Sequence, residues 1–320
     1  MNTDSDVKAV DQLVDKYQLL RNEIGKVIVG QDKVVENLIL TIFSKGHCLL
    51  VGVPGLAKTL LINTIADALG LDFNRIQFTP DLMPSDIVGS EILGEDRKFK
   101  FIKGPLFSNI ILADEINRTP PKTQAALLEA MQERSVTAAG ERYELGKPFF
   151  VLATQNPIEQ EGTYPLPEAQ LDRFMFNIKV DYPSFEEELQ IVKNTTTDRK
   201  TDVQKVLSSQ DILDIQALIR RIPVADNVLE YAVKLAAKTR PGREHATDMV
   251  NKYISWGAGP RASQYLVLGA KTHAAIKGKY SPDIEDVKAV APEILRHRVV
   301  RNYKAEAEGM SFEKILNELF

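Results

Sequence analysis

The chain has 320 residues, enough for one large domain or two ordinary ones. A hydrophobic fraction of 44% and a charged fraction of 26% are usual for a globular protein and exclude a disordered chain. Lysine and arginine number 40 against 44 acidic residues, a net charge of -4, which argues against a protein that coats DNA or RNA.

A single cysteine, Cys48, excludes an intrachain disulfide and fits a reducing compartment. The first residues include Asp4, Ser5 and Asp6 instead of a basic stretch followed by an apolar run, so we expect no signal peptide. No window approaches the roughly 18 consecutive apolar residues of a membrane helix. We therefore expect a cytoplasmic protein without a membrane span.

Two helices are predicted at the start of the chain. Apolar residues recur at helical spacing from Val7 to Ile24, and this stripe either packs on the main domain or binds a partner. A second helix is predicted over Gln31–Phe43.

Strand and helix patterns then alternate. The predicted strands are His47–Val51, Phe73–Phe78, Ile110–Ala113, Phe149–Ala153 and Phe174–Val180. The segments between them include predicted helices at Lys58–Leu69 and Lys122–Glu133, and the segment Pro167–Asp172. This alternation predicts an α/β fold with a parallel sheet between helices, which binds ligands at the C-terminal ends of its strands.

Two hairpins are predicted to interrupt this alternation, at Val88–Lys103 and at Ser135–Leu145. The strand pattern ends near Tyr182–Ser184, which predicts a domain boundary. The helices expected after it are Phe185–Thr195, Asp211–Arg220, Asp226–Lys238, Pro260–Lys277 and Pro282–Arg298. We expect an extension over residues 1–28, an α/β domain over 29–183 and an all-helical domain over 184–320. The amphipathic tail Gly309–Phe320 is either docked or an interaction peptide.

The strongest chemical signal lies between the first predicted strand and its helix. It reads Gly52-Val53-Pro54-Gly55-Leu56-Ala57-Lys58-Thr59. Glycines let backbone N–H groups turn toward a triphosphate, and the helix start adds positive charge beneath it. Lys58 would reach the β- and γ-phosphates, and the Thr59 hydroxyl would bind Mg²⁺. Ala57 replaces the usual last glycine, which is tolerable in helical geometry; a plain glycine turn is the alternative interpretation.

A second signal is the apolar run Ile110–Ala113, which ends in Asp114 and Glu115. Two adjacent carboxylates at the end of a buried strand are costly without a cation nearby. Asp114 is expected to hold the hydration shell of Mg²⁺, as acidic residues at this place do in phosphate-loop enzymes. Glu115 would polarise the water that attacks the γ-phosphate. Strands often end in acidic residues, so the pair alone is a weak signal. It indicates a magnesium and water site because a phosphate loop precedes it in the chain.

Three further polar residues lie at the ends of predicted elements. Asn156 either positions the attacking water and contacts the γ-phosphate, or forms an ordinary Asn-Pro turn with Pro157. Arg173 is either a cation supplied to the γ-phosphate of a neighbouring subunit or part of a surface ion pair. Arg261 either reaches back over the nucleotide from the helical domain or is a solvated arginine at a helix start.

The order of these motifs resembles that of AAA+ ATPases, and their amino-acid sequences resemble those of the MoxR family. The strings that carry the resemblance are Val29-Gly30-Gln31, Gly52–Thr59, Ala113-Asp114-Glu115-Ile116-Asn117-Arg118, Ala153-Thr154-Gln155-Asn156-Pro157 and Glu168-Ala169-Gln170-Leu171-Asp172-Arg173-Phe174. The similarity runs from about Tyr17 to Arg298. It implies an AAA+ P-loop NTPase core with a five-stranded parallel sheet, followed by a helical lid.

The resemblance also implies roles for single residues. Lys58, Thr59, Asp114 and Glu115 take the places of the Walker motifs, Asn156 that of sensor 1 and Arg261 that of sensor 2. Arg173 matches an arginine finger that acts on the ATP of the adjacent subunit. Val29 and Gly30 match the segment beside the adenine, and Leu60 completes the expected nucleotide-binding set after Thr59. The two hairpins match insertions typical of this branch.

ATP and Mg²⁺ are therefore the expected ligands, and turnover the expected activity. The resemblance implies a homo-oligomer, a hexameric ring, that works with von Willebrand factor A domain proteins to remodel client complexes or to mature their metal cofactors. One alternative is a nucleic-acid-stimulated motor, in which Lys98, Lys100 and Lys103 line a pore, although the acidic total argues against extensive phosphate contact. Another alternative is a nucleotide-gated scaffold without turnover.

Overall fold

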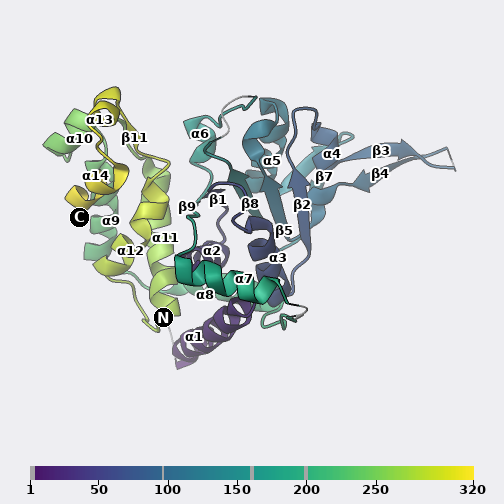
Figure 1. The fold of residues 1–320 in the computed structure, drawn as a ribbon, viewed down its shortest axis with the longest axis horizontal. Helices are drawn as coiled ribbons and strands as arrows, with labels where there is room; N and C mark the ends of the chain where they lie inside the picture. Colours follow the sequence, from purple (N-terminus) through teal and green to yellow (C-terminus); the bar gives the residue numbers. More distant parts are fainter. Residues whose placement is uncertain (1–3, 96, 159–161, 198–200) are drawn as a thin grey trace. The chain divides into compact units, whose positions relative to one another are not determined.

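The computed structural model describes residues 4–95, 97–158, 162–197 and 201–320, and the chain forms two compact units (Figure 1). The α/β unit comprises Gln18–Pro167 and Ile178–Leu213. The helical unit comprises Met1–Tyr17, Glu168–Asn177 and Asp214–Phe320. The domain boundaries expected from the sequence, at 29–183 and 184–320, remain a prediction.

The α/β unit is built on a five-stranded sheet with the strand order β2-β5-β8-β1-β9. The strands are β1 (Cys48–Val51), β2 (Phe73–Gln77), β5 (Ile110–Asp114), β8 (Phe150–Gln155) and β9 (Phe176–Lys179). The pairs β2–β5, β5–β8 and β1–β8 are parallel. Every residue of Ile110–Ala113 is buried, so both faces of the central strand are covered. The predicted parallel α/β sheet is confirmed.

The helices of this unit begin and end at residues suited to those positions. They are α2 (Asp32–Phe43), α3 (Lys58–Leu69), α4 (Pro84–Val88), α5 (Pro121–Glu133) and α7 (Phe185–Thr195), with 3-10 turns η1 (Pro105–Phe107) and η2 (Ile116–Arg118). Helix α3 ends at Gly70 in the left-handed conformation, and α5 starts with Pro121 in its first turn. Ser184 and Glu187 form a capping box at the start of α7.

Both predicted hairpins are present and antiparallel. They pair β3 (Gly89–Leu93) with β4 (Phe99–Lys103), and β6 (Ser135–Ala138) with β7 (Glu141–Glu144). The two hairpins are in contact, because the rings of Phe101 in β4 and Tyr143 in β7 stack at 4.4 Å between centroids. Beyond that contact the β3–β4 hairpin projects away from the sheet (Figure 1).

The helical unit contains the helices expected after residue 183, except the helix over Phe185–Thr195, which is α7 of the α/β unit. It also contains short helices that the sequence pattern did not reveal. The helices that lie in it or run into it are α1 (Asp4–Gly25), α6 (Glu168–Leu171), α8 (Ser209–Arg221), α9 (Asp226–Lys238), α10 (Asp248–Tyr253), α11 (Pro260–Ile276), α12 (Ile284–Leu295), α13 (Tyr303–Ala307) and α14 (Phe312–Leu319). Helix α11 packs against α9 and α12. Gly269 permits the close approach of α12, since a Cβ there would lie 3.2 Å from Val290 Cγ2.

One detail departs from the expectation that this region is all helical. Strands β10 (Ile254–Trp256) and β11 (Val300–Arg301) form a small antiparallel ladder. Strands of two or three residues are too short to show an alternating pattern in the sequence, so they could not be recognised there.

Two amphipathic segments left open by the sequence are docked on the protein. In α1 the apolar stripe is almost fully buried, and in α14 the apolar residues are buried as well. The residues concerned are Val10, Leu13, Tyr17, Leu20 and Ile24 in α1, and Phe312, Ile315, Leu316 and Leu319 in α14. In the part of the chain that the structure describes, no helix has the length and apolar character needed to cross a bilayer.

Candidate nucleotide site

The predicted phosphate loop connects the end of β1 to the start of α3. Gly52 is required by packing, because a Cβ there would lie 2.6 Å from the carbonyl oxygen of Val180. Gly55 has a φ of 85°, a conformation that favours glycine. The glycines of the loop therefore serve both its turn and its close contact with the chain beyond β9.

Ala57 is not in the right-handed helical geometry that we expected to make its methyl group tolerable. Its φ of 52° and ψ of 27° are left-handed, and it forms the N-cap of α3. An L-residue other than glycine, asparagine or aspartate pays about 1 kcal/mol or more for this conformation. The alanine is accommodated with some strain at the point where the loop enters the helix.

Lys58 folds back over the loop. Its ammonium group donates to the carbonyl oxygen of Gly52 and, at 3.1 Å, to that of Val53. Burial lowers the pKa of Lys58, and the negative charges of Asp114 and Glu115 oppose this shift. The lysine and the acidic pair therefore lie within electrostatic reach of one another.

A threonine that the sequence interpretation left without a role holds the acidic pair in place. The hydroxyl of Thr154, on β8, donates to Asp114 Oδ1 at 2.6 Å and accepts from the Glu115 backbone N–H at 2.8 Å. Glu115 has a left-handed φ of 57°, which turns the chain sharply after β5. This bridge joins the ends of two adjacent strands at the point where the chemistry is expected.

Cationic and amide groups hold the outer oxygens of the two carboxylates. Arg75, on β2, donates to Asp114 Oδ2 through Nε at 3.0 Å and Nη2 at 2.6 Å. Glu115 Oε2 accepts from Gln77 Nε2 and from Arg118 Nη1, each at 3.1 Å. The sequence offered no signal for Arg75 or Gln77, because their importance follows from β2 lying beside β5.

Asn156 follows the end of β8 and is buried. Its side-chain oxygen accepts from the backbone N–H of Ile158 at 3.1 Å, so the turn that was the alternative interpretation is present. A turn does not conflict with a sensor role, because the turn fixes the amide at the strand end.

The segment expected beside the adenine also lies close to the phosphate loop. Gln31 Nε2 lies 3.5 Å from the carbonyl oxygen of Leu56. Gly30 has a φ of 68°, and a Cβ there would collide with the Glu187 carboxylate of α7. The structure thus places Gln31 of this segment beside the phosphate loop, while the nucleotide contacts of Val29, Gly30, Leu60 and Asn156 remain predictions.

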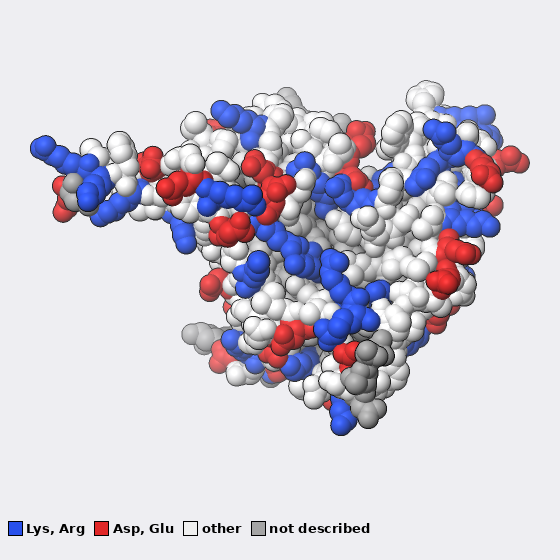
Figure 2. Space-filling model, turned by 180° about the vertical axis from the view of Figure 1, so that it is seen from behind, with Lys and Arg blue, Asp and Glu red and all other residues white. Residues whose placement is uncertain are grey.

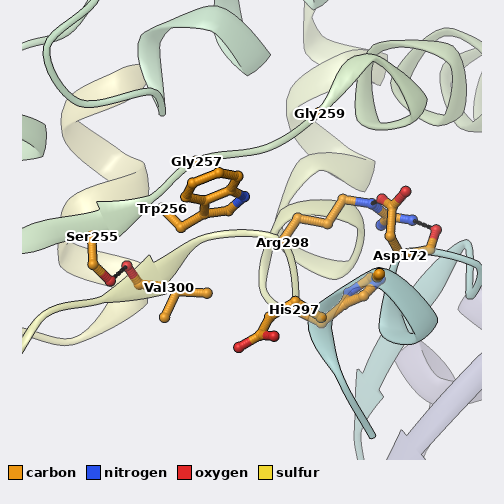
Figure 3. Close-up of a pocket in the computed structure, with 10 residues that line it drawn as sticks. Asp172, Ser255, Trp256, Gly257, Gly259, His297, Arg298 and Val300 are labelled. Atoms are coloured by element: carbon orange, nitrogen blue, oxygen red, sulfur yellow. Dashed lines mark hydrogen bonds and ion pairs between the residues drawn. The ribbon is translucent and has the colours of Figure 1, made fainter.

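The other two predicted residues, Arg173 and Arg261, belong to the helical unit. Arg261, in the first turn of α11, donates through Nη1 to Asp172 Oδ2 at 2.6 Å. The same aspartate accepts from Arg298 Nε at 2.7 Å on its other oxygen. Figure 3 shows Asp172 and Arg298 facing each other. Both line a pocket of about 620 Å³, together with the exposed Trp256 and the buried His297.

These features define a P-loop nucleoside triphosphatase with an AAA-type core. Residues 47–176 match the family described as "ATPase family associated with various cellular activities (AAA)", and residues 246–319 match the AAA lid domain. A putative ATPase from Cytophaga hutchinsonii superposes with a TM-score of 0.92 at 45% identity, covering 98% of this chain and 95% of that one.

Relatives specify the family further. Chaperone MoxR1 of Mycobacterium tuberculosis is 44% identical over 93% of this chain and 79% of its own length. The uncharacterized protein YeaC of Bacillus subtilis is 41% identical over 92% of this chain and 90% of its own. Protein MoxR of Methylorubrum extorquens is 33% identical over 89% and 88%. The chain belongs to the MoxR family of AAA+ ATPases.

Proposed function

We propose that the chain binds and hydrolyses MgATP where β1, β8 and β5 end. The observation that carries this proposal is that three neighbouring parallel strands end, at one edge of the sheet, in the phosphate loop, Asn156 and the Asp114-Glu115 pair. Backbone amides ahead of Lys58 hold the phosphates, Glu115 polarises the attacking water, and Asn156 positions that water against the γ-phosphate.

The residues present fit Mg²⁺. This ion prefers oxygen ligands and is usually bound by one or two carboxylates together with substrate phosphates and water. The Thr59 hydroxyl and the Asp114 carboxylate supply that set, with Thr154 orienting Asp114 through its hydroxyl. When bound, the ion neutralises charge on the β- and γ-phosphates. Val29, Gly30 and Leu60 complete the proposed contacts to the nucleotide.

The test compares two substitutions that separate binding from hydrolysis. Lys58→Ala should abolish ATP binding, because the loop loses its cation. Glu115→Gln should retain ATP binding but lower turnover by about 100-fold or more, since the amide cannot polarise water. Fluorescent-nucleotide titration measures the binding, and phosphate release measures the turnover.

Glu133→Gln, at the solvent-exposed end of α5, is the matched control and should leave both quantities unchanged. Normal phosphate release by Glu115→Gln would remove the assignment of Glu115. Absence of turnover in the unsubstituted protein at high concentration would support the nucleotide-gated scaffold instead.

We further propose that the active form is a ring, with six subunits as the family resemblance implies. Arg173 then completes the site of the adjacent subunit, and Arg261 reports on the ATP of its own subunit from the lid. A finger supplied by a neighbour stabilises charge on the γ-phosphate in the transition state. This arrangement makes turnover depend on assembly.

The proposed work of the cycle is chaperone-like remodelling of protein partners, including metal-cofactor maturation with von Willebrand factor A domain proteins. Support comes from the β3–β4 hairpin, whose exposed apolar side chains include Ile92, Leu93, Phe99 and Ile102. Figure 2 shows basic and acidic side chains mixed along this hairpin rather than a uniformly basic surface. Such a surface suits a polypeptide better than a nucleic acid. Salt-sensitive stimulation of turnover by single-stranded DNA would favour the nucleic-acid motor instead.

A further inference from the structure

A buried arginine holds the segment that carries Arg173. Only 2% of the Arg298 side chain is exposed. Its Nε donates to Asp172 Oδ1 at 2.7 Å, and its Nη2 donates to the carbonyl oxygens of Asp172 at 2.7 Å and Phe174 at 2.6 Å. Its Nη1 donates to the carbonyl oxygens of Met175 at 3.2 Å and Ile294 at 2.5 Å. A buried guanidinium is retained only where such partners compensate its desolvation.

Four further contacts tie the same segment to the helices of its unit. The Tyr265 hydroxyl of α11 donates to the carbonyl oxygen of Arg173 at 3.3 Å, and Arg261 of α11 pairs with Asp172 at 2.6 Å. His297 Nε2 and Arg296 Nη1, just after α12, contact the carbonyl oxygens of Phe174 at 3.0 Å and Asn177 at 2.8 Å. Nearly every backbone carbonyl oxygen from Asp172 to Asn177 therefore accepts a hydrogen bond from a side chain of the helical unit.

These contacts explain an unexpected feature of the fold. Glu168–Asn177 follows β8 in the chain and includes Phe176 and Asn177, the first two residues of β9, yet it groups with the C-terminal helices in one compact unit. Figure 3 shows Asp172 of this segment beside Arg298 of the lid. We call the buried ion pair of Asp172 and Arg298 the clamp. Because it is charged and multiply hydrogen-bonded, it is expected to move as one body with the elements it joins.

We propose that Asp172 and Arg298 are positioning residues that fix Arg173 to the lid, so that the arginine finger moves with the lid helices. This inference rests on the proposed roles of Arg173 and Arg261. Asp172 gives one carboxylate oxygen to Arg298 and the other to Arg261. When Arg261 turns to the ATP of its own subunit, Asp172 loses one of its two cations. Nucleotide state in one site is thereby transmitted to the finger that serves the next.

The test is complementation between full-length variants. Asp172→Asn and Arg298→Lys leave the phosphate loop intact, so each should bind ATP with a Kd within about threefold of the unsubstituted protein while turnover falls about tenfold or more. Lys58→Ala cannot bind ATP but keeps its finger. In an equal mixture with either clamp variant, turnover should recover to about a quarter of the unsubstituted level, because about one interface in four pairs an intact site with an intact finger.

Tyr265→Phe is a milder variant that keeps the aromatic ring over Arg298 and removes only the hydroxyl that reaches Arg173. It should lower turnover by about twofold to fivefold. In an equal mixture with Lys58→Ala, turnover per subunit that binds ATP should then rise by about 1.5-fold to threefold, because half of those subunits gain a neighbour with an intact finger. It keeps the test decisive if the stronger variants do not fold. Arg301→Lys, on β11 and bonded to Met310, is the matched control and should behave as the unsubstituted protein.

An equal mixture of the Arg173→Ala and Lys58→Ala proteins tests the proposed arginine finger separately from the proposed role of Asp172 and Arg298. If that mixture recovers turnover and the Asp172→Asn mixture does not, the clamp acts only within its own subunit and the inference is overturned. If neither mixture recovers, Arg173 does not act on a neighbour, and the proposed finger falls together with the inference. Recovery of both mixtures to a similar level supports the clamp.

Discussion

At the scale of single residues, the motif positions were predictable because phosphate chemistry dictates residue types at short spacing. Lys58 begins α3, Asp114 ends β5 and Glu115 follows it, as the strand and helix patterns predict. The groups that hold them were not predictable. Thr154, Arg75 and Gln77 act across strands distant in the chain, and no local pattern indicates which strands become neighbours.

The strained conformation of Ala57 leads to a prediction about stability. Ala57→Gly should raise the free energy of unfolding by up to about 1 kcal/mol, because glycine adopts the left-handed conformation without steric cost. ATP affinity should be retained, since the loop keeps its backbone path. Urea denaturation and nucleotide titration measure the two quantities.

Ala66→Gly is the comparison within the same helix. Ala66 is fully buried in the right-handed interior of α3, so its replacement should lower stability by about 1 kcal/mol or more. If both glycine variants were destabilised equally, the conformation of Ala57 would not be the source of its cost.

At the scale of elements, the five strands, the two hairpins and the long helices could be predicted because their apolar periods run over several residues. The strand order β2-β5-β8-β1-β9 could not, because hydrophobic patterns specify which faces are buried but not which edges pair. The ladder of β10 with β11 and the grouping of Glu168–Asn177 with the helices depend on long-range contacts such as those of Arg298.

A buried histidine joins three elements of the α/β unit. His47 precedes β1, its Nδ1 accepts from the Val151 N–H of β8 at 2.9 Å, and its Nε2 lies 3.2 Å from the carbonyl oxygen of Met131 in α5. The ring is neutral in this arrangement, since Nδ1 must keep its lone pair. Burial lowers the pKa of His47 to about 4, and the nearby charge of Arg134 contributes in the same direction.

Acid should therefore weaken the fold before the carboxylates titrate. The unfolded histidine has a pKa of about 6.5, so between roughly pH 6.5 and 4 the unfolded chain binds a proton that folded His47 does not. Stability should fall as the pH drops through this window, with His47 accounting for roughly 2 kcal/mol between pH 7 and 5. Urea denaturation at the two pH values measures the loss.

His47→Gln should reduce this pH dependence, because glutamine does not titrate. His297→Gln should reduce it separately, since burial also lowers the pKa of His297 well below its ordinary value. An unchanged pH dependence in His47→Gln would show that His47 is not the group responsible. Asp286 stays ionised over the whole window, because hydrogen bonds from His273, the Asp283 backbone N–H and Lys279 lower its pKa to about 2 although burial opposes this shift.

At the scale of the whole molecule, membership of the MoxR family is established, while the ring, its six subunits, its partners and the cytoplasmic location remain predictions. The surface of the α/β unit offers one physical reason to expect association. Helix α7 has no buried residue, and Phe185, Leu189 and Val192 are exposed at helical spacing. An apolar stripe left in water is a feature of surfaces that bind other proteins.

If Arg173 completes the site of a neighbour, turnover per subunit must depend on protein concentration. Below the dissociation constant of the interface, the fraction of subunits with a neighbour falls with dilution, so turnover per subunit should fall by about tenfold for a tenfold dilution. ATP binding by the phosphate loop should change far less over the same range. Phosphate release from micromolar to nanomolar protein, with mass photometry on the same samples, tests both statements.

The Arg173→Ala protein supplies the control for this dilution series. It should assemble over the same concentration range, because the substitution removes one side chain and leaves the clamp of Asp172 and Arg298 in place. Its low turnover should then be the same at every concentration, since no neighbour brings an arginine to the γ-phosphate. Constant turnover per subunit in the unsubstituted protein, maintained after mass photometry shows only monomers, would mean that each subunit carries a complete site of its own.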